Sequence, residues 1–320
     1  MKYVEASSFG GPEVLTTIEK ETPRPGDGMM LVEVQAAGIN YADVMARSGS
    51  YPSVTKAPFT PGLEVAGVVR EVGKGVDGFK AGDSVAAVTP AGGGYASHVV
   101  IPAAMAIPFP HQLDPAVAAA VLVQGITAYI LLDQAQVKND DVVLIAAAAG
   151  GVGSLAVQLA KSRGAMVIGL ASESKFDLVK RLGADHVFDY GQSGWSLEAQ
   201  DITGSRGVQV FLDSVGDLAS EAFPLLSQSG RWLIYGVRTG NRNALPAEAL
   251  WPMIEKSISL TGFNLGGSLH LVPRALTELF KLVNDGTLKT QITRYPLSDA
   301  RRVHTLFEER KTTGKLVLIP

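Results

Sequence analysis

The strongest constraint on the fold is a regular alternation of apolar runs and amphipathic stretches between residues 141 and 262. Residues 142–146 form a continuous apolar run, which is typical of a parallel strand covered on both faces. A helical pattern over 152–162 follows, and another apolar run covers 166–170. This alternation predicts an α/β fold with a doubly wound parallel sheet of the Rossmann type.

The same alternation continues through the rest of this region. A helix is expected over 175–182, where Gly183 would end it. The further strands that the pattern predicts are 187–190, 208–212, 231–235 and an edge strand over 257–262.

The flanking regions have a different character. The first hundred residues are rich in turns, with strands expected over 31–36, 65–72, 84–88 and 96–101, and a helix over 115–123 that starts at an Asp114 cap. After residue 266 we expect helices over 273–284 and 298–310 and a strand over 315–319. Our hypothesis is a discontinuous catalytic domain (1–118 and 267–320) with a cofactor domain (119–266) inserted into it, and a cleft between the two.

Composition excludes several classes of function. The 320 residues carry a net charge of −3 without a basic stretch, so nothing supports a nucleic-acid partner. No apolar run that we identify has the length of a signal peptide or a membrane span, and we expect a cytoplasmic protein without a membrane partner. The absence of cysteine excludes disulfides, thiolate nucleophiles and cysteine-bound zinc.

The turn between the first strand and the first helix of the alternating region is rich in glycine. Residues 145–155 read Ile-Ala-Ala-Ala-Ala-Gly-Gly-Val-Gly-Ser-Leu. In a dinucleotide-binding turn one glycine lets the backbone approach the pyrophosphate and another lets helix and strand pack closely, and Gly150 and Gly153 suit these tasks. The helix N-terminus would also attract the phosphates. Ala148 replaces the first glycine of the fingerprint. The alternative interpretation, a glycine-rich turn that binds no ligand, therefore stays open.

The end of the next strand bears on which dinucleotide binds. NAD usually needs an acidic residue about 20 residues downstream to bond the ribose 2′-hydroxyl. Ala171 stands there, followed by Ser172 and Lys175, whose hydroxyl and ammonium suit a 2′-phosphate. These residues favour NADPH. Two alternatives stay open, because Glu173 could bond the ribose and Ser172 or Ser174 could simply cap the next helix.

Several motifs together resemble the zinc-independent quinone oxidoreductases of the medium-chain dehydrogenase/reductase superfamily, the group of zeta-crystallin. The resemblance covers essentially the whole chain and implies a GroES-like catalytic domain split around a Rossmann domain. It also makes Ala-x-x-Gly-x-x-Gly the expected form of the turn. The motifs are residues 36–43, 61–67, 124–128, 147–153, 182–185, 213–216 and 314–318.

The resemblance implies roles for individual residues. Asn40 matches an asparagine near the nicotinamide and the substrate carbonyl, and Tyr51 matches a tyrosine of the same cleft, so both are catalytic candidates and Asn40 also a cofactor ligand. Thr127 matches a residue beside the cofactor phosphates and Tyr190 a tyrosine on the adenosine side. The other cofactor-binding candidates are Gly150, Gly151, Val152, Gly153, Ser172, Lys175, Ser214, Gly216, Gly236, Asn264 and Lys315.

Two positions depart from relatives of this kind. Zinc-dependent relatives carry a histidine where this chain has Leu63, although Glu64 is kept, and the five histidines form no i, i+4 pair. We therefore predict no metal site. Met45 stands where some quinone reductases have a second aromatic residue, so the identity of the substrate does not transfer.

The resemblance implies NADPH-dependent hydride transfer to quinones or other α,β-unsaturated carbonyls. Such conjugated acceptors need less help from a Lewis acid than a simple ketone does, because the charge delivered with the hydride spreads over the conjugated system. Two rival functions stay open: a 2-enoyl thioester or alkenal reductase on the same fold, and a non-catalytic NADPH-binding protein. A homodimer formed through the edge strand over 257–262 is a further expectation from the family.

Overall fold

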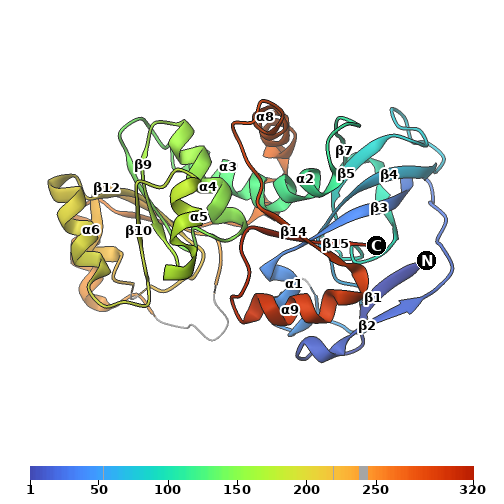
Figure 1. Ribbon diagram of the computed structural model, residues 1–320, viewed down its shortest axis with the longest axis horizontal. Coiled ribbons are helices and arrows are strands. Elements are labelled where there is room, and N and C mark those ends of the chain that lie inside the picture. The colour runs from blue at the N-terminus through green and yellow to red at the C-terminus, as the bar shows by residue number, and fades with distance from the viewer. Residues whose placement is uncertain (53, 219, 238–243) are drawn as a thin grey trace. The chain divides into compact units, whose positions relative to one another are not determined.

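The computed structural model describes residues 1–52, 54–218, 220–237 and 244–320 (Figure 1). The chain divides into two compact units. The first unit comprises Met1–Gln124, Leu276–Asn284 and Thr290–Pro320. The second unit comprises Gly125–Ala275 and Asp285–Lys289.

A seven-stranded sheet organises the first unit, and its longest strand, β3 (Met29–Ile39), lies in the middle. The strand order is β14-β15-β3-β4-β5-β7, and β6 also pairs with β3. Neighbouring strands are antiparallel except β14 and β15, which run parallel. The other strands are β4 (Glu64–Val72), β5 (Ser84–Val88), β6 (His98–Pro102), β7 (Ala106–Pro108), β14 (Ile292–Pro296) and β15 (Lys315–Ile319).

Alternation along β3 explains how this sheet makes a core. Met30, Val32 and Val34 are buried in one hydrophobic cluster, as expected for side chains at i, i+2 and i+4 on one face of a strand. A separate antiparallel pair, β1 (Lys2–Ala6) and β2 (Leu15–Glu19), adds Val4 and Leu15 to the same cluster. The helices of this unit are α1 (Tyr41–Arg47), α2 (Pro115–Ala120), α9 (Ala300–Glu308) and the part of α8 (Val272–Asn284) from Leu276 on.

A six-stranded parallel sheet organises the second unit, in the order β10-β9-β8-β11-β12-β13. The order reverses between β8 and β11, and such a switch point is where open α/β sheets bind ligands, beyond the carboxyl ends of the strands. The strands are β8 (Val142–Ile145), β9 (Met166–Leu170), β10 (His186–Phe188), β11 (Val208–Asp213), β12 (Leu226–Ile234) and β13 (Ser259–Gly262). The helices are α3 (Ile126–Gln134), α4 (Gly151–Ser162), α5 (Phe176–Arg181), α6 (Trp195–Thr203) and α7 (Leu250–Glu255).

The predicted fold class is confirmed, and so is the edge position of the strand expected over 257–262. The strand expected over 187–190 is shorter, because β10 ends at Phe188. Asp189 turns the chain there, since its carboxylate accepts hydrogen bonds from the backbone amides of Glu173 and Gly191.

The helix expected over 115–123 is longer than predicted. Asp114 caps its start through a bond from the Ala116 amide, but the helix passes through a π turn at Val121–Gly125 and continues to Gln134. By length and composition alone, Pro115–Gln134 could therefore cross a membrane. The sequence analysis did not identify this segment, because it ended the helix at residue 123. Within the structure 78% of this window is buried, as in the core helix of a globular protein.

Candidate functional site

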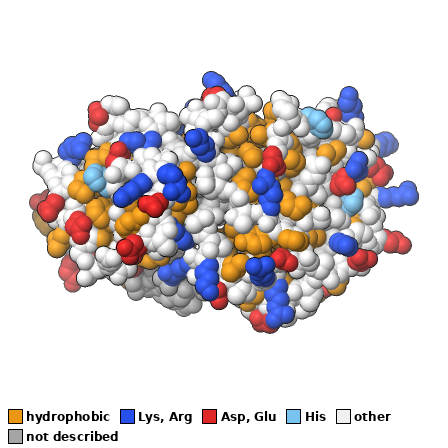
Figure 2. Space-filling view, in the orientation of Figure 1, with side chains coloured by type: hydrophobic (Ala, Val, Ile, Leu, Met, Phe, Trp, Pro, Cys, Tyr) orange, Lys and Arg blue, Asp and Glu red, His pale blue; other side chains and the backbone are white. Residues whose placement is uncertain are grey.

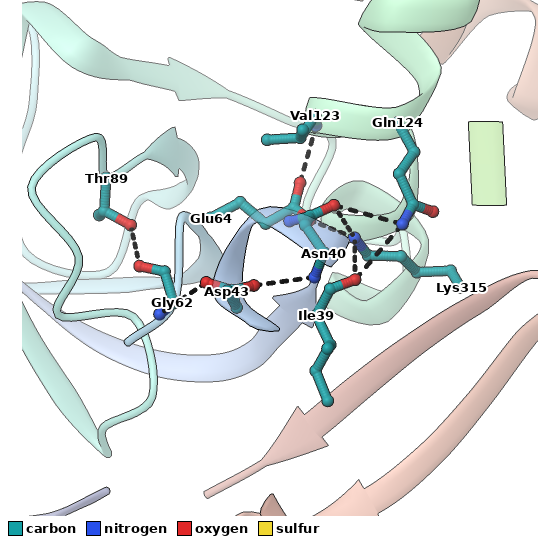
Figure 3. A network of polar contacts seen from close by, with 9 residues as sticks. All are labelled: Ile39, Asn40, Asp43, Gly62, Glu64, Thr89, Val123, Gln124 and Lys315. Atoms are coloured by element: carbon teal, nitrogen blue, oxygen red, sulfur yellow. Dashed lines mark hydrogen bonds and ion pairs between the residues drawn. The ribbon is translucent and has the colours of Figure 1, made fainter. Parts of the chain in front are cut away.

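Asn40 lies where β3 ends and α1 begins. Its backbone amide donates to Asp43 Oδ2 at 2.8 Å, so the carboxylate of the first helical turn fixes the backbone at Asn40. The other oxygen, Asp43 Oδ1, accepts from the Gly62 amide at 3.0 Å. Thr89 Oγ1 donates to the Gly62 carbonyl at 2.8 Å and anchors that loop in turn (Figure 3). The start of α1 and the segment before β4 are thus tied together at one carboxylate.

Hydrogen bonds hold the side chain of Asn40 on both sides (Figure 3). Its Nδ2 donates to Glu64 Oε1 at 2.7 Å. Its Oδ1 accepts from Lys315 Nζ at 3.0 Å and from Gln124 Nε2 at 3.2 Å. A carboxamide held by an acceptor on one side and two donors on the other has a single orientation. Asn40 is 5% exposed, so these partners rather than solvent decide that orientation.

Glu64 and Lys315 form an ion pair in the interior of the first unit. Both side chains are buried, and Nζ bonds Oε1 of the carboxylate. Glu64 Oε2 accepts from the Val123 amide at 2.7 Å, and Lys315 Nζ also donates to the Ile39 carbonyl at 3.1 Å. These extra bonds meet the requirement that a buried charge be both paired and hydrogen-bonded.

The sheet register explains why Lys315 reaches Asn40 across so much sequence. β15 pairs with β3 so that Leu316 lies opposite Ile39 and Val317 opposite Gly38. A Cβ atom on Gly38 would lie 2.3 Å from Glu64 Oε1 and 2.7 Å from Lys315 Cε. Only a residue without a side chain leaves room there for the ion pair.

Asp43 is the group whose acidity the site changes most clearly. Burial raises its pKa to about 7, against the lowering effect of the Asn40 and Gly62 amides and of Lys315. Burial and the charge of Asp43 also raise the pKa of Tyr95 well above its ordinary value. The Asp43 carboxyl group therefore changes its protonation state near neutral pH.

Tyr51 lies on the loop that follows α1. Its backbone amide donates to the Met45 carbonyl at 3.1 Å, and its half-buried phenol makes no hydrogen bond to the described residues. Met45 is half-buried on α1. The structure thus brings Asn40 and Lys315 into direct contact in the first unit, whereas Tyr51 takes no part in their network.

The glycine-rich turn lies in the second unit between β8 and α4. The Ala148 amide donates to the Leu170 carbonyl at 3.0 Å, which ties the turn to the end of β9. A Cβ atom on Gly153 would lie 2.3 Å from the Ala147 carbonyl oxygen, so α4 packs on the turn more closely than any side chain allows. Among the described residues the amides of Gly151, Val152 and Gly153 have no partner, as expected in the first turn of a helix.

The other cofactor candidates of the second unit lie at strand ends or just beyond them. Ser172 follows β9, and its carbonyl accepts from the Lys175 amide at 2.9 Å. Tyr190 follows β10 and is exposed. Thr127 is buried in α3, and Asn264, beyond β13, is exposed and accepts from the Gly266 amide at 2.7 Å.

Asp213 supports the candidates at the ends of β11 and β12. Its Oδ1 accepts from the amides of Val215 and Gly216, and its Oδ2 accepts from Trp232 Nε1 at 3.1 Å. The Tyr235 amide donates to the Asp213 carbonyl at 2.9 Å. Ser214, Gly216 and Gly236 therefore follow two adjacent parallel strands, next to the switch point at β8.

Sequence reasoning left Asp43, Glu64 and Gln124 out of the candidate site. Glu64 was considered only as a possible zinc ligand. A carboxylate directly before the apolar run 65–69 was the available signal, since such a buried charge requires a partner. In the described part of the chain, no three or more His, Cys, Asp and Glu side chains are grouped as a metal site would require.

Comparison with known proteins places this architecture in a family. Residues 26–111 match the model of the alcohol dehydrogenase GroES-like domain, and residues 151–284 match that of the zinc-binding dehydrogenases. Quinone oxidoreductase 1 of Escherichia coli is 36% identical over 327 residues, which cover 99% of both chains. The chain belongs to the quinone oxidoreductases of the medium-chain dehydrogenase/reductase superfamily. The family that the motifs predicted is thus confirmed.

Solved structures similar to this chain support the same family. The Escherichia coli quinone oxidoreductase crystallised with NADPH has a TM-score of 0.93 and 34% identity, and the match covers all of both chains. A mycobacterial structure complexed with NADPH has a TM-score of 0.89, 33% identity and the same full coverage. The rat synaptic vesicle membrane protein VAT-1 homolog is 34% identical over 342 residues, or all of this chain and 84% of the relative.

Proposed function

We propose that the protein is an NADPH-dependent oxidoreductase that transfers a hydride to quinones or other α,β-unsaturated carbonyls without a metal. The observation that carries this proposal is the full-length likeness to a quinone oxidoreductase crystallised with NADPH. The pinned carboxamide of Asn40 adds a group suited to holding a carbonyl oxygen.

The residues of the second unit fit a dinucleotide. Three unbonded amides at the start of α4 and the close approach at Gly153 make a cradle for phosphates. We propose that the phosphates are held by Thr127 and by Gly150, Gly151, Val152 and Gly153. Ser172 and Lys175 would hold the 2′-phosphate, and the remaining proposed contacts are Tyr190, Ser214, Gly216, Gly236 and Asn264.

When bound, the cofactor supplies the hydride from C4 of its nicotinamide ring. The protein supplies orientation and hydrogen bonds. Asn40 orients the acceptor by donating an Nδ2 hydrogen to its carbonyl oxygen, which becomes more basic as the charge arrives. Tyr51 donates a second hydrogen bond or helps to deliver the proton, and its phenol has no partner among the described residues that would compete.

The donor set supports a reaction without zinc. The sequence has no cysteine, and the remaining acidic residue of the zinc-dependent pattern, Glu64, is bonded to Lys315, Asn40 and Val123. Metal analysis of the purified protein tests this point, and one tightly bound zinc per chain would refute it.

Oxidation of NADPH against a panel of quinones, enones, enals and a 2-enoyl thioester, with NADH as the control cofactor, tests the proposal. Turnover of quinones or enones supports it. Turnover of enals or thioesters alone would favour a different reductase, and tight NADPH binding without turnover would favour a non-catalytic role. Asn40→Ala should lower kcat and leave the affinity for NADPH unchanged, whereas an unchanged rate would remove Asn40 from the mechanism.

We also propose a homodimer formed along β13. This strand is the exposed edge of its sheet, and the apolar side chains of Leu250, Trp251 and Ile254 on α7 are exposed. An open edge with exposed apolar groups nearby invites pairing with a second copy. Light scattering should give twice the mass of one chain, and Trp251→Ser should shift it toward one chain.

A cytoplasmic location is the remaining proposal. On the face shown in Figure 2 basic and acidic side chains are interspersed, which offers no single charged surface for a membrane or a nucleic acid. Fractionation of cells that express the chain tests it, and recovery in the membrane fraction would contradict it.

A further inference from the structure

A buried ammonium group stands next to the proposed substrate-binding amide. Lys315 Nζ is surrounded by three oxygens, those of the Ile39 carbonyl, Asn40 Oδ1 and Glu64 Oε1 (Figure 3). Lysine has three donors and no acceptor, so these three contacts use its whole capacity. Lys315 therefore has no donor left for a ligand in this arrangement.

The network leaves one hydrogen of the Asn40 carboxamide available among the described residues. Asn40 Oδ1 is occupied by Lys315 and Gln124, and one Nδ2 hydrogen is occupied by Glu64. The second Nδ2 hydrogen has no acceptor among the described residues. Because the carboxamide is held on both sides, that hydrogen has a fixed direction before any ligand arrives.

We propose that Glu64, Lys315 and Gln124 are positioning residues that act through Asn40, and that they present its second Nδ2 hydrogen to a carbonyl oxygen of the acceptor. This inference rests on the proposed function and deepens it. It assigns Lys315 to the substrate side of the chemistry instead of to the cofactor. The site thereby selects acceptors whose reacting carbon is conjugated to a hydrogen-bond-accepting oxygen.

Gln124→Met is the most informative variant. It removes the bond to Asn40 Oδ1 and a longer one, at 3.3 Å, to the Ile39 carbonyl, which Lys315 also bonds, and it keeps the length of the side chain. It also removes Gln124 Oε1, a buried acceptor without a partner in the described structure, so the fold should tolerate it. We expect kcat to fall about 2- to 12-fold, the worth of one ordinary hydrogen bond, with no change in the dissociation constant of NADPH.

A double-mutant cycle separates positioning from a general structural effect. If Gln124 acts through Asn40, then Gln124→Met should have no further effect on kcat in an Asn40→Ala background. Gln209→Met is the matched control, because the side chain of Gln209 makes two hydrogen bonds near the amino ends of β8 and β11, at the opposite end of these strands from their carboxyl ends. It should leave kcat and the cycle unchanged. Additive effects of Gln124→Met and Asn40→Ala would overturn the proposal.

The ion pair is tested by removing both charges together. Glu64→Gln with Lys315→Met leaves no unpaired buried charge, so it should fold where either single variant fails. We expect kcat to fall about 10- to 100-fold through loss of orientation, with NADPH affinity unchanged. A loss of NADPH affinity would instead make Lys315 a cofactor ligand and overturn its assignment.

A measurement without cofactor or substrate keeps this test independent of the proposed function. In protein labelled with [15N]asparagine, the Asn40 side chain should give two well-separated amide proton signals, which Gln124→Met should shift. Unshifted signals would overturn the positioning role. If these signals shift but no acceptor is reduced, the network stands and the proposed function fails.

Discussion

Tyr95 and His304 meet in the core of the first unit, with the phenol oxygen 3.2 Å from Nε2 of the imidazole and the two rings edge to face at 85°. Both side chains have no exposed surface. Burial and the nearby charge of Arg47 lower the pKa of His304 to about 3. The folded protein therefore keeps this histidine neutral where an unfolded chain would protonate it.

His304 should make the protein sensitive to acid. Between the unfolded pKa of 6.5 and the folded value of about 3, the unfolded chain binds one proton more, so stability falls as the pH falls. The slope approaches about 1.4 kcal/mol per pH unit. His304→Phe should lose this contribution in urea unfolding at pH 4.5–6.5. His270→Gln, at an exposed position, is the control, and an unchanged slope in His304→Phe would contradict the prediction.

Asp43 should contribute a slope of the opposite sign. Its folded pKa is raised to about 7 from 3.8, so the folded protein binds one proton more in this window, and the stability is lost as the pH rises through about 7. In Asp43→Asn the free energy of unfolding should therefore rise more steeply with pH between 5 and 7 than in the wild type. Parallel pH profiles for the two proteins would show that the carboxyl group is ionised throughout. Between about pH 4 and 6.5 the contributions of Asp43 and His304 offset each other.

Gly38→Ala should disturb the ion pair without touching Asn40. The new methyl group would overlap Glu64 Oε1 and Lys315 Cε, and overpacking of this kind costs about 1–3 kcal/mol. We expect a lower melting temperature and a lower kcat, with unchanged NADPH affinity. Gly26→Ala, which meets nothing within 4 Å, is the matched control. Full activity in Gly38→Ala would contradict this prediction, because it would mean that Glu64 and Lys315 can shift without lowering kcat.

Lys175→Ala tests the choice between NADPH and NADH. A charge-assisted contact with the 2′-phosphate contributes roughly 1.5–3 kcal/mol, so NADPH affinity should fall about 10- to 150-fold while NADH affinity stays the same. Lys180→Ala changes an exposed lysine of the neighbouring α5 and should alter neither affinity. Titrations that show no change for either cofactor in Lys175→Ala would place the 2′-phosphate elsewhere.

Local patterns predicted the elements of the parallel sheet well, because each apolar run and each helix start is encoded within a few residues. The strand at Met166–Leu170 has the predicted bounds. The prediction ended the helix from Pro115 at residue 123, whereas the structure continues it through Gly125 to Gln134. Burial of its neighbours, such as Leu122 and Ile126, carries the helix through that glycine.

The candidate site was only partly accessible to the same reasoning. Asn40 and Lys315 were singled out by resemblance, but the contact between them depends on the pairing of β15 with β3. Gln124 reaches Asn40 only because α2, which precedes it in the chain, packs against β3 and β4. Long-range pairings of this kind leave no local signature in a single sequence.

The ion pair of Glu64 and Lys315 also has a consequence for biosynthesis. The two residues are 251 positions apart, and the main segment of the second unit, Gly125–Ala275, is translated between them. A nascent chain therefore holds the carboxylate of Glu64 for most of its synthesis without the ammonium that balances it. Addition of β15 beside β3 should be a late step in forming the first sheet, and until it occurs Asn40 lacks the bond from Lys315 that helps to fix its direction.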